Sequence, residues 1–242
     1  QNRFISDWNK IQIKKPEKLG VTVLQNYSLS TLRKYIDWTP FFLTWELKGK
    51  YPTIFDNDKY GKEARRLFED ANKLLDRIIN ENLISASGVF GLFPANTVAV
   101  DDIEIYSDDS RKGVRNVFHT LRSQGEKVQE SHNLALADYI APKDSGLKDY
   151  IGAFAVTAGI GIEKVVAQFE KDHDDYNSIM VKALADRLAE AFTELLHKKV
   201  RKEIWAYLPT EKLSLDDLLL EHYQGIRPAH GYPACPDHSE KE

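Results

Sequence analysis

Tyr150-Ile151-Gly152-Ala153-Phe154-Ala155-Val156-Thr157 is a nearly continuous apolar run. So short a run predicts a strand, and its lack of charged side chains predicts that the strand is buried. Residues 161–205 then change to helical spacing, as two helices or one long bent helix. The apolar positions that mark a buried helix face there are Leu184, Leu188, Ala191, Phe192, Leu195 and Leu196. Because strands and helices mix along the chain without a regular βαβ period, we expect an α+β fold.

Shorter strands are expected on the N-terminal side of this run. Val89–Phe93 should form one and end at Pro94, which cannot donate to a sheet ladder. Residues 102–106 alternate between apolar and polar side chains, which places Tyr106 on the polar face. Residues 134–140 form a further strand-like apolar run.

Helical spacing is clearest over residues 61–80, where the apolar side chains form a single stripe. A shorter helix beginning near Ser30 must end before Pro40, because the residue preceding a proline avoids the helical region. Residues 114–121 fit a helix by spacing, although a strand is also compatible with them.

The two ends of the chain carry weaker signals. Ser214 and Asp217 form a capping box that predicts the start of a last short helix, and Gly225 suits the position just after its end. Residues 1–20 bear Lys and Pro with weak periodicity, so we expect a linker or arm. The segment 227–242 is expected to be loop-like.

Composition excludes several classes of protein. The chain has 242 residues, of which 42% are hydrophobic and 29% are charged, values that fit an ordinary globular domain. Its net charge of −4 argues against a dedicated nucleic-acid binder. A single cysteine excludes an internal disulfide framework and fits a reducing compartment. No apolar run approaches the roughly 20 residues that span a bilayer, and neither a P-loop nor a dinucleotide-binding glycine fingerprint is present.

The segment Arg227–Pro236 carries the first candidate site. Pro228 restricts Arg227 to an extended backbone, so its guanidinium is aimed and can grip a carboxylate through two parallel hydrogen bonds. Gly231 permits close approach of a ligand to the backbone, and Tyr232 adds a flat face and a hydroxyl. A proline-stiffened surface loop with an exposed arginine is the alternative.

Two further patterns are ambiguous. Cys235 and His238 have the spacing of half a zinc site, but no second half is visible, and a buried reduced thiol is the simpler interpretation. Asp37 stands before the aromatic segment 38–42 and could accept a hydrogen bond from a ligand amino group. Local backbone amides could equally satisfy its carboxylate.

Asp186, Glu190 and Glu194 form an acidic ladder with a spacing of one helical turn. Like charges at this spacing repel by a few tenths of a kcal/mol per pair, roughly. Arg187 and Lys198 should offset that repulsion, and the default interpretation is a solvated helix face. A docking face for a partner that carries a cation or a protonatable histidine is the functional alternative.

Five blocks occur in one order along the chain and together carry a family resemblance. They are Tyr35–Phe42, Gly91–Asn96, Asp102–Tyr106, Asp149–Thr157 and Arg227–His238. The chain thereby resembles the C-terminal activation domain of cobalamin-dependent methionine synthase.

The resemblance implies a C-shaped α+β domain with a central antiparallel sheet flanked by helices, which binds S-adenosylmethionine. The parent enzyme is a cytoplasmic methyltransferase of methionine biosynthesis, and this module is not expected to be active alone. Cobalamin is held by another module of that enzyme, and zinc only by the absent homocysteine module. Flavodoxin or a similar donor supplies the electron for reactivation. No nucleic-acid or membrane partner, no metal ligand and no catalytic residue is expected in this chain.

Residue by residue, the resemblance implies ligand contacts from two parts of the chain. Asp37 would accept a hydrogen bond, and Glu221 would face the positive amino or sulfonium group. Arg227 would take the ligand carboxylate, and the family's Arg-x-x-x-Gly-Tyr signature ends at Gly231 and Tyr232.

Ala229 would add a backbone contact in that signature, and the resemblance assigns Asp186 and Glu190 to docking against the cobalamin module. We expect residues 1–20 to be an arm and residues 21–242 to be the activation domain, shortened at its C-terminal end because family members continue further. The alternative function is a standalone S-adenosylmethionine-binding or regulatory protein, or a reactivator of a separate corrinoid protein.

Overall fold

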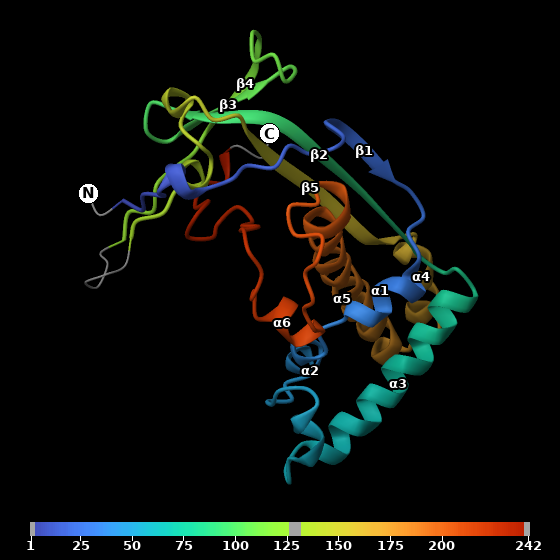
Figure 1. Ribbon diagram of the computed structural model, residues 1–242. Coiled ribbons are helices and arrows are strands. Elements are labelled where there is room, and N and C mark those ends of the chain that lie inside the picture. Colours follow the sequence, from blue (N-terminus) through green and yellow to red (C-terminus); the bar gives the residue numbers. More distant parts are fainter. Residues whose placement is uncertain (1–2, 126–131, 240–242) are drawn as a thin grey trace.

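The computed structural model describes residues 3–125 and 132–239. Gln1, Asn2 and residues 240–242, which belong to the predicted arm and tail, lie outside this range. Within it, an open antiparallel sheet is flanked by helices, which confirms the predicted α+β class (Figure 1). No helix in the described part of the chain is long and apolar enough to cross a bilayer.

The sheet is organised around one long central strand. The described strands are β1 (Gly20–Leu24), β2 (Ser85–Val98), β3 (Asp102–Tyr106), β4 (Val114–His119) and β5 (Asp149–Ile160). Along one edge β2 pairs with β5. Along its other edge it pairs first with β1 and then with β3, which in turn pairs with β4. Every one of these pairings is antiparallel.

The helices lie mainly on one side of the sheet. They are α1 (Leu29–Leu32), α2 (Thr39–Thr44), α3 (Gly61–Asn80), α4 (Ile162–Lys171), α5 (Asp175–Lys199) and α6 (Leu215–Leu219). α3 matches its predicted range, and the segment after β5 forms two helices, as one of the two predicted alternatives had it. A π-helical turn, Val200–Ile204, extends α5. Figure 1 shows α5 between the sheet and the outer helices.

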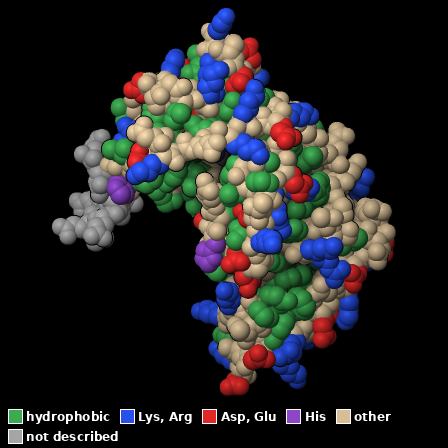
Figure 2. Space-filling view, in the orientation of Figure 1, with side chains coloured by type: hydrophobic (Ala, Val, Ile, Leu, Met, Phe, Trp, Pro, Cys, Tyr) green, Lys and Arg blue, Asp and Glu red, His purple; other side chains and the backbone are tan. Residues whose placement is uncertain are grey.

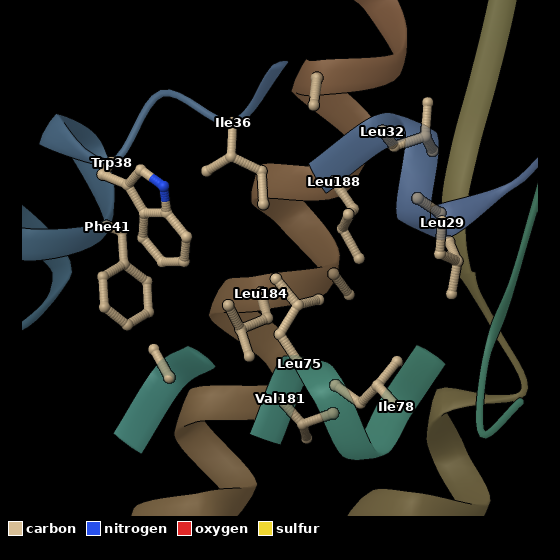
Figure 3. Close-up of a cluster of buried hydrophobic side chains, with 14 of the residues drawn as sticks. Leu29, Leu32, Ile36, Trp38, Phe41, Leu75, Ile78, Val181, Leu184 and Leu188 are labelled. Atoms are coloured by element: carbon tan, nitrogen blue, oxygen red, sulfur yellow. The ribbon is translucent and has the colours of Figure 1, made fainter. Parts of the chain in front are cut away.

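The main core surrounds α5. Every apolar position predicted for its buried face is buried, including Leu184 and Leu188. Figure 3 shows side chains of α1 and α3 and of the segment around Trp38 converging on these two leucines. Because a fully buried leucine contributes roughly 1.5–3 kcal/mol through burial, this single helix accounts for much of the apolar stabilisation.

A glycine lets α5 approach the central strand closely. A Cβ atom at Gly88 in β2 would lie 3.2 Å from Cζ of Phe192 and 3.0 Å from Cγ1 of Val156. The Phe192 ring is fully buried and lies 4.6 Å from the ring of Tyr27, measured between centroids. Phe192 therefore fills the space that the missing side chain leaves.

The prediction that a strand ends at Pro94 is wrong. β2 continues through Pro94 to Val98. Its neighbour on one edge changes at this point, since β1 pairs with residues 88–92 and β3 with residues 95–98. Pro94 thus occupies the junction between two ladders, where a missing backbone donor is tolerated.

The prediction that residues 150–157 are buried is only partly right. Tyr150 is buried and Phe154 is half-buried toward α5, but Ala153, Ala155 and Thr157 are exposed on the opposite face. An antiparallel sheet can leave one face open to water. The small apolar residues on this open face made the run appear continuous.

The segments at the far end of the sheet differ from their predicted types. Residues 114–119 form strand β4, so the helical interpretation is wrong and the strand alternative holds. β4 returns against β3 through a turn in which Ser107 N–H donates to Gly113 O at 3.0 Å. Tyr106 shares the face of Glu104, as predicted, since its hydroxyl donates to Glu104 Oε2 at 2.8 Å, but its ring is buried against Arg111.

Residues 134–140 are not a strand. Leu136–Tyr139 is a short 3₁₀ helix. Its geometry comes from Asp138, whose buried carboxylate accepts from Ala135 N at 3.0 Å and from the Arg122 guanidinium at 2.6 and 2.7 Å. An aspartate that captures a local backbone amide competes with strand pairing.

The last helix begins where predicted and ends earlier. Ser214 and Asp217 form the capping box, with Ser214 Oγ accepting from Asp217 N at 3.1 Å. α6 stops at Leu219, and Glu221 adopts the left-handed conformation with φ of 58°. Gly225 is therefore not the residue just after the helix, although its φ of 98° is also left-handed.

The overall outline is curved, as the resemblance implied. In Figure 1 the chain after α5 runs beneath the sheet, between the helices and the β3–β4 end. Figure 2 shows the molecule hollowed on that side. The C-terminal segment of the described chain consequently lies along the inner side of the curve.

The packing against Gly88 leads to a stability prediction. Phe192→Ala should lower the free energy of unfolding by about 3–5 kcal/mol, because it removes a buried ring and leaves a cavity beside β2. Urea unfolding followed by circular dichroism measures this. Ile179→Ala on the same helix is the control, since Ile179 is 48% exposed and its loss should change stability by no more than about 0.5 kcal/mol. Equal losses in both variants would contradict the packing described.

Candidate functional site

Arg227 lies against the acidic face of α5. Its Nη2 donates to Oε1 of Glu194, and its Nη1 lies 3.9 Å from Oε1 of Glu190. The two carboxylates differ in environment, since the Glu194 side chain is 6% exposed and that of Glu190 is 48% exposed. The guanidinium is thus held on its inner side and faces a looser acidic partner on its outer side.

A buried arginine, Arg201, lies near this contact and acts on Glu194 through its charge. Arg201 is fully buried in the π-helical turn and donates from Nε and Nη2 to the two carboxylate oxygens of Glu211, at 2.8 and 2.9 Å. Its Nη1 lies 2.8 Å from Nδ1 of His197, and its plane covers the Tyr223 ring at 4.2 Å. This set of side chains joins α5 to the chain on both sides of α6.

Burial and charge compete at Glu194. Burial raises the pKa of its carboxyl group, and the negative charges of Glu190 and Glu221 raise it further, whereas Arg227 and Arg201 act in the opposite direction. The predicted residues Glu190, Glu221 and Arg227 therefore share one electrostatic environment. The prediction that the whole acidic ladder is a solvated face is wrong at Glu194, because Arg227 rather than Lys198 compensates it.

His197 is held neutral. Burial lowers the pKa of its imidazole to about 3, and the nearby charges of Arg201 and Arg227 add to this effect. A neutral ring can accept a hydrogen bond at Nδ1, so the Arg201 guanidinium is the donor. The edge-to-face contact with Tyr223, at 4.7 Å between centroids, fixes the ring orientation.

The rest of the predicted signature forms a compact turn. Gly231 has φ of 96°, and a Cβ there would lie 2.7 Å from Nε2 of His238. Tyr232 N donates to Ala229 O at 3.3 Å, while Gly231 N and Cys235 O bond at 2.8 Å. The Tyr232 side chain is 63% exposed, so its ring presents an open flat face.

Cys235 is a buried thiol, as the simpler interpretation had it. Burial raises its pKa, and its Sγ lies 3.6 Å from Nδ1 of His230. Among residues 3–125 and 132–239, no group of three or more His, Cys, Asp or Glu side chains is arranged to hold a metal ion.

Two predicted residues lie apart from Arg227 in their contacts. Asp37 Oδ1 accepts from Thr39 N at 2.9 Å and caps the first turn of α2. This is the local interaction that formed the alternative for Asp37. Asp186 is 72% exposed and pairs with Arg187 at 2.6 Å, on the outer face of α5.

Sequence reasoning missed the supporting residues His197, Arg201, Glu211 and Tyr223. His197 and Arg201 continue the acidic ladder along the same helix face, where polar side chains suggest solvent. Their burial follows from the return of the chain beyond α6. A signal in the sequence was the polar face that continues from Glu190 to Arg201 over several helical turns. So long a polar face on a helix can be covered by another part of the chain.

Comparison with known protein families shows which family the chain belongs to. The model for the activation domain of vitamin B12-dependent methionine synthase matches residues 28–242. The chain belongs to this family. The matched range includes α1 to α6 and the whole of the Arg227 signature.

A solved structure supports the same assignment for the activation domain. It is a crystal structure of the MetH reactivation domain bound to AdoHcy, at 56% sequence identity and a TM-score of 0.93. The match covers 99% of this chain and 73% of that chain. The two proteins are therefore similar in sequence as well as in fold.

The neutral His197 leads to a pH prediction. Its folded pKa of about 3 lies below the ordinary value of 6.5. Between these two pH values the imidazole is protonated in the unfolded chain and neutral in the folded chain. The stability that depends on this group is complete above about 6.5 and is lost as the pH falls toward 3. His197→Gln keeps an acceptor for Arg201 and should flatten the acid side of the stability profile, measured by urea unfolding between these pH values.

The contribution of Glu194 to the pH dependence of stability has the opposite sign, because its raised pKa favours the folded state at acid pH. The difference between wild type and His197→Gln isolates the histidine. His222→Gln is the control, because His222 is exposed beside Asp217. A profile of His197→Gln that overlays wild type would contradict the neutral buried state.

Proposed function

We propose that this chain binds S-adenosylmethionine and serves as the reactivation module of a cobalamin-dependent methionine synthase. The observation that carries the proposal is its 56% identity, across 99% of the chain, to a reactivation domain whose structure holds AdoHcy. AdoHcy is what remains of S-adenosylmethionine after its methyl group is transferred. A site for one has the contacts needed for the other.

The residues present fit an amino-acid-bearing ligand. Nε of Arg227 is buried without a hydrogen-bond partner among the described residues, and Nη1 is too far from Glu190 for a hydrogen bond. Arg227 therefore retains donors for a carboxylate. Glu190 and Glu221 add negative charge nearby, which suits an ammonium or sulfonium group.

Other residues of the predicted site would complete the ligand contacts. The turn with left-handed Gly231 would place backbone groups beside a ligand held by Arg227, and Ala229 would contribute one of them. Tyr232 offers an exposed ring as a flat wall. We retain Asp37 as a hydrogen-bond acceptor, because its second carboxylate oxygen is not needed for the bond to Thr39.

The chemistry requires positioning rather than acid–base catalysis. When bound, S-adenosylmethionine supplies a methyl group to the reduced cobalt of cobalamin held by another module. Arg227 and the 229–232 turn would orient the ligand and leave its methyl group accessible. A site built from an arginine, acids and an aromatic ring, without a nucleophile, matches this task.

The proposal includes partners of the same enzyme. Asp186, exposed on the outer face of α5, and the half-exposed Glu190 would dock against the cobalamin module. An electron donor such as flavodoxin would reduce the cobalt in the cytoplasm. The parent reaction would form methionine from homocysteine and methyltetrahydrofolate.

Arg227→Ala tests ligand binding. It should weaken the binding of S-adenosylmethionine by about 2–5 kcal/mol, because a charge-assisted carboxylate contact is lost from a desolvated position. Calorimetric titration of the chain measures this. Arg65→Ala, which removes an exposed arginine of α3, should bind as wild type does. Equal affinity of Arg227→Ala and wild type would rule out the assigned role.

Asp186→Asn tests docking separately from ligand binding. Since the Asp186 carboxylate pairs with Arg187 rather than Arg227, the variant should bind S-adenosylmethionine normally and slow reactivation in the full-length enzyme. The rate of methylcobalamin recovery, followed by absorbance, measures the effect. Asp175→Asn, at the N-terminal end of α5, serves as control. Unchanged reactivation in Asp186→Asn would contradict the docking role.

A further inference from the structure

The two acidic partners of Arg227 hold it unequally. Glu194 accepts from Nη2 and is almost completely buried, whereas Glu190 lies 3.9 Å from Nη1 and is half-exposed. A buried carboxylate on a helix has few alternative rotamers, while a half-exposed one is free to move. The inner contact therefore fixes the guanidinium, and the outer one does not.

Arg227 needs such a support. It lies in a segment without regular secondary structure, beyond α6. An arginine side chain on a loop loses about 2 kcal/mol of rotamer entropy when a ligand immobilises it. A partner that immobilises the side chain beforehand removes that cost from the binding step.

Glu194 is itself well anchored. It stands in the middle of the last turns of α5, between buried neighbours on the core face such as Leu195. Arg201, about two helical turns further along, forms its hydrogen bonds with Glu211 and His197. The Glu194 carboxylate therefore remains available to Arg227.

We propose that Glu194 is the positioning residue that holds Arg227 ready for the carboxylate of the bound ligand. This inference rests on the proposed function. A ligand carboxylate would approach the outer side of the guanidinium, where it would displace the long contact to Glu190. Glu194 does not touch the ligand and acts through Arg227.

The test compares two ligands that differ only in the carboxylate. S-adenosylmethionine and its decarboxylated analogue are titrated into wild type and Glu194→Gln, which keeps the shape of the side chain and removes its charge. Glu194→Gln should weaken S-adenosylmethionine by about tenfold to a hundredfold, the range for loss of an orienting partner in metal sites. The decarboxylated analogue should bind both proteins equally, which also shows that the variant is folded.

A double-mutant cycle completes the test. In an Arg227→Ala background, Glu194→Gln should cause no further loss, because Arg227 is the group through which Glu194 acts. Glu203→Gln, on the π-helical turn and 61% exposed, is the matched control and should leave both affinities unchanged.

Four outcomes would overturn the inference alone, and a fifth would overturn it together with the proposed function. Equal weakening of both ligands would assign Glu194 a purely structural role. Tighter binding of S-adenosylmethionine by Glu194→Gln would make Glu194 a competitor for Arg227. Unchanged affinity, or the same loss with and without Arg227, would remove the link between the two residues. Failure of wild type to bind S-adenosylmethionine would instead overturn the proposed function, and this inference with it.

Discussion

The charge of Arg201 has to be compensated inside the protein. An unpaired guanidinium in the interior costs several kcal/mol, approximately, so the chain must deliver partners to it. Glu211 and Tyr223 come from segments before and after α6, and His197 comes from α5 itself. Meeting this requirement turns the chain back along α5. Arg227, four residues beyond Tyr223, is then brought to Glu194 by the same return.

Arginines have a similar role at the other end of the sheet. Arg111 lies between the rings of Tyr106 and Tyr150, at 5.3 Å from each, and donates to Asn96 Oδ1 at 2.6 Å. Arg122 joins Asp138 to the backbone of Asn133. Arg111 thus ties a turn to the strand β2, and Arg122 ties irregular segments to one another. The planar fork of arginine suits this task because it satisfies several acceptors at once.

Local periodicity predicted the parts of the fold that depend on one face. α3 was predicted over its whole length because its stripe is continuous, and α5 because its leucines recur at helical spacing. β4 was ambiguous because its apolar residues fit both periods, and the partner that decided it, β3, lies across a turn. The predicted strand end at Pro94 was wrong for the same reason. A proline is tolerated within β2 because the neighbouring strand changes there from β1 to β3. In the site, Arg227 and Glu190 were found as separate patterns. Their proximity, and the burial of Glu194, follow from long-range packing that no local pattern contains.

The return of the chain after α5 also has a dynamic consequence. The segment from Ala206 to Ser239 has no strand in the sheet, and in the described part of the chain much of its attachment consists of a few charged side-chain contacts and one short helix. Opening this segment removes the partners of Arg201 but breaks no sheet ladder, so it should require less energy than melting β2 or α5. Backbone amides of this segment should therefore exchange with solvent hydrogen while the sheet stays protected. A ligand that binds at Arg227 should slow the exchange of these amides.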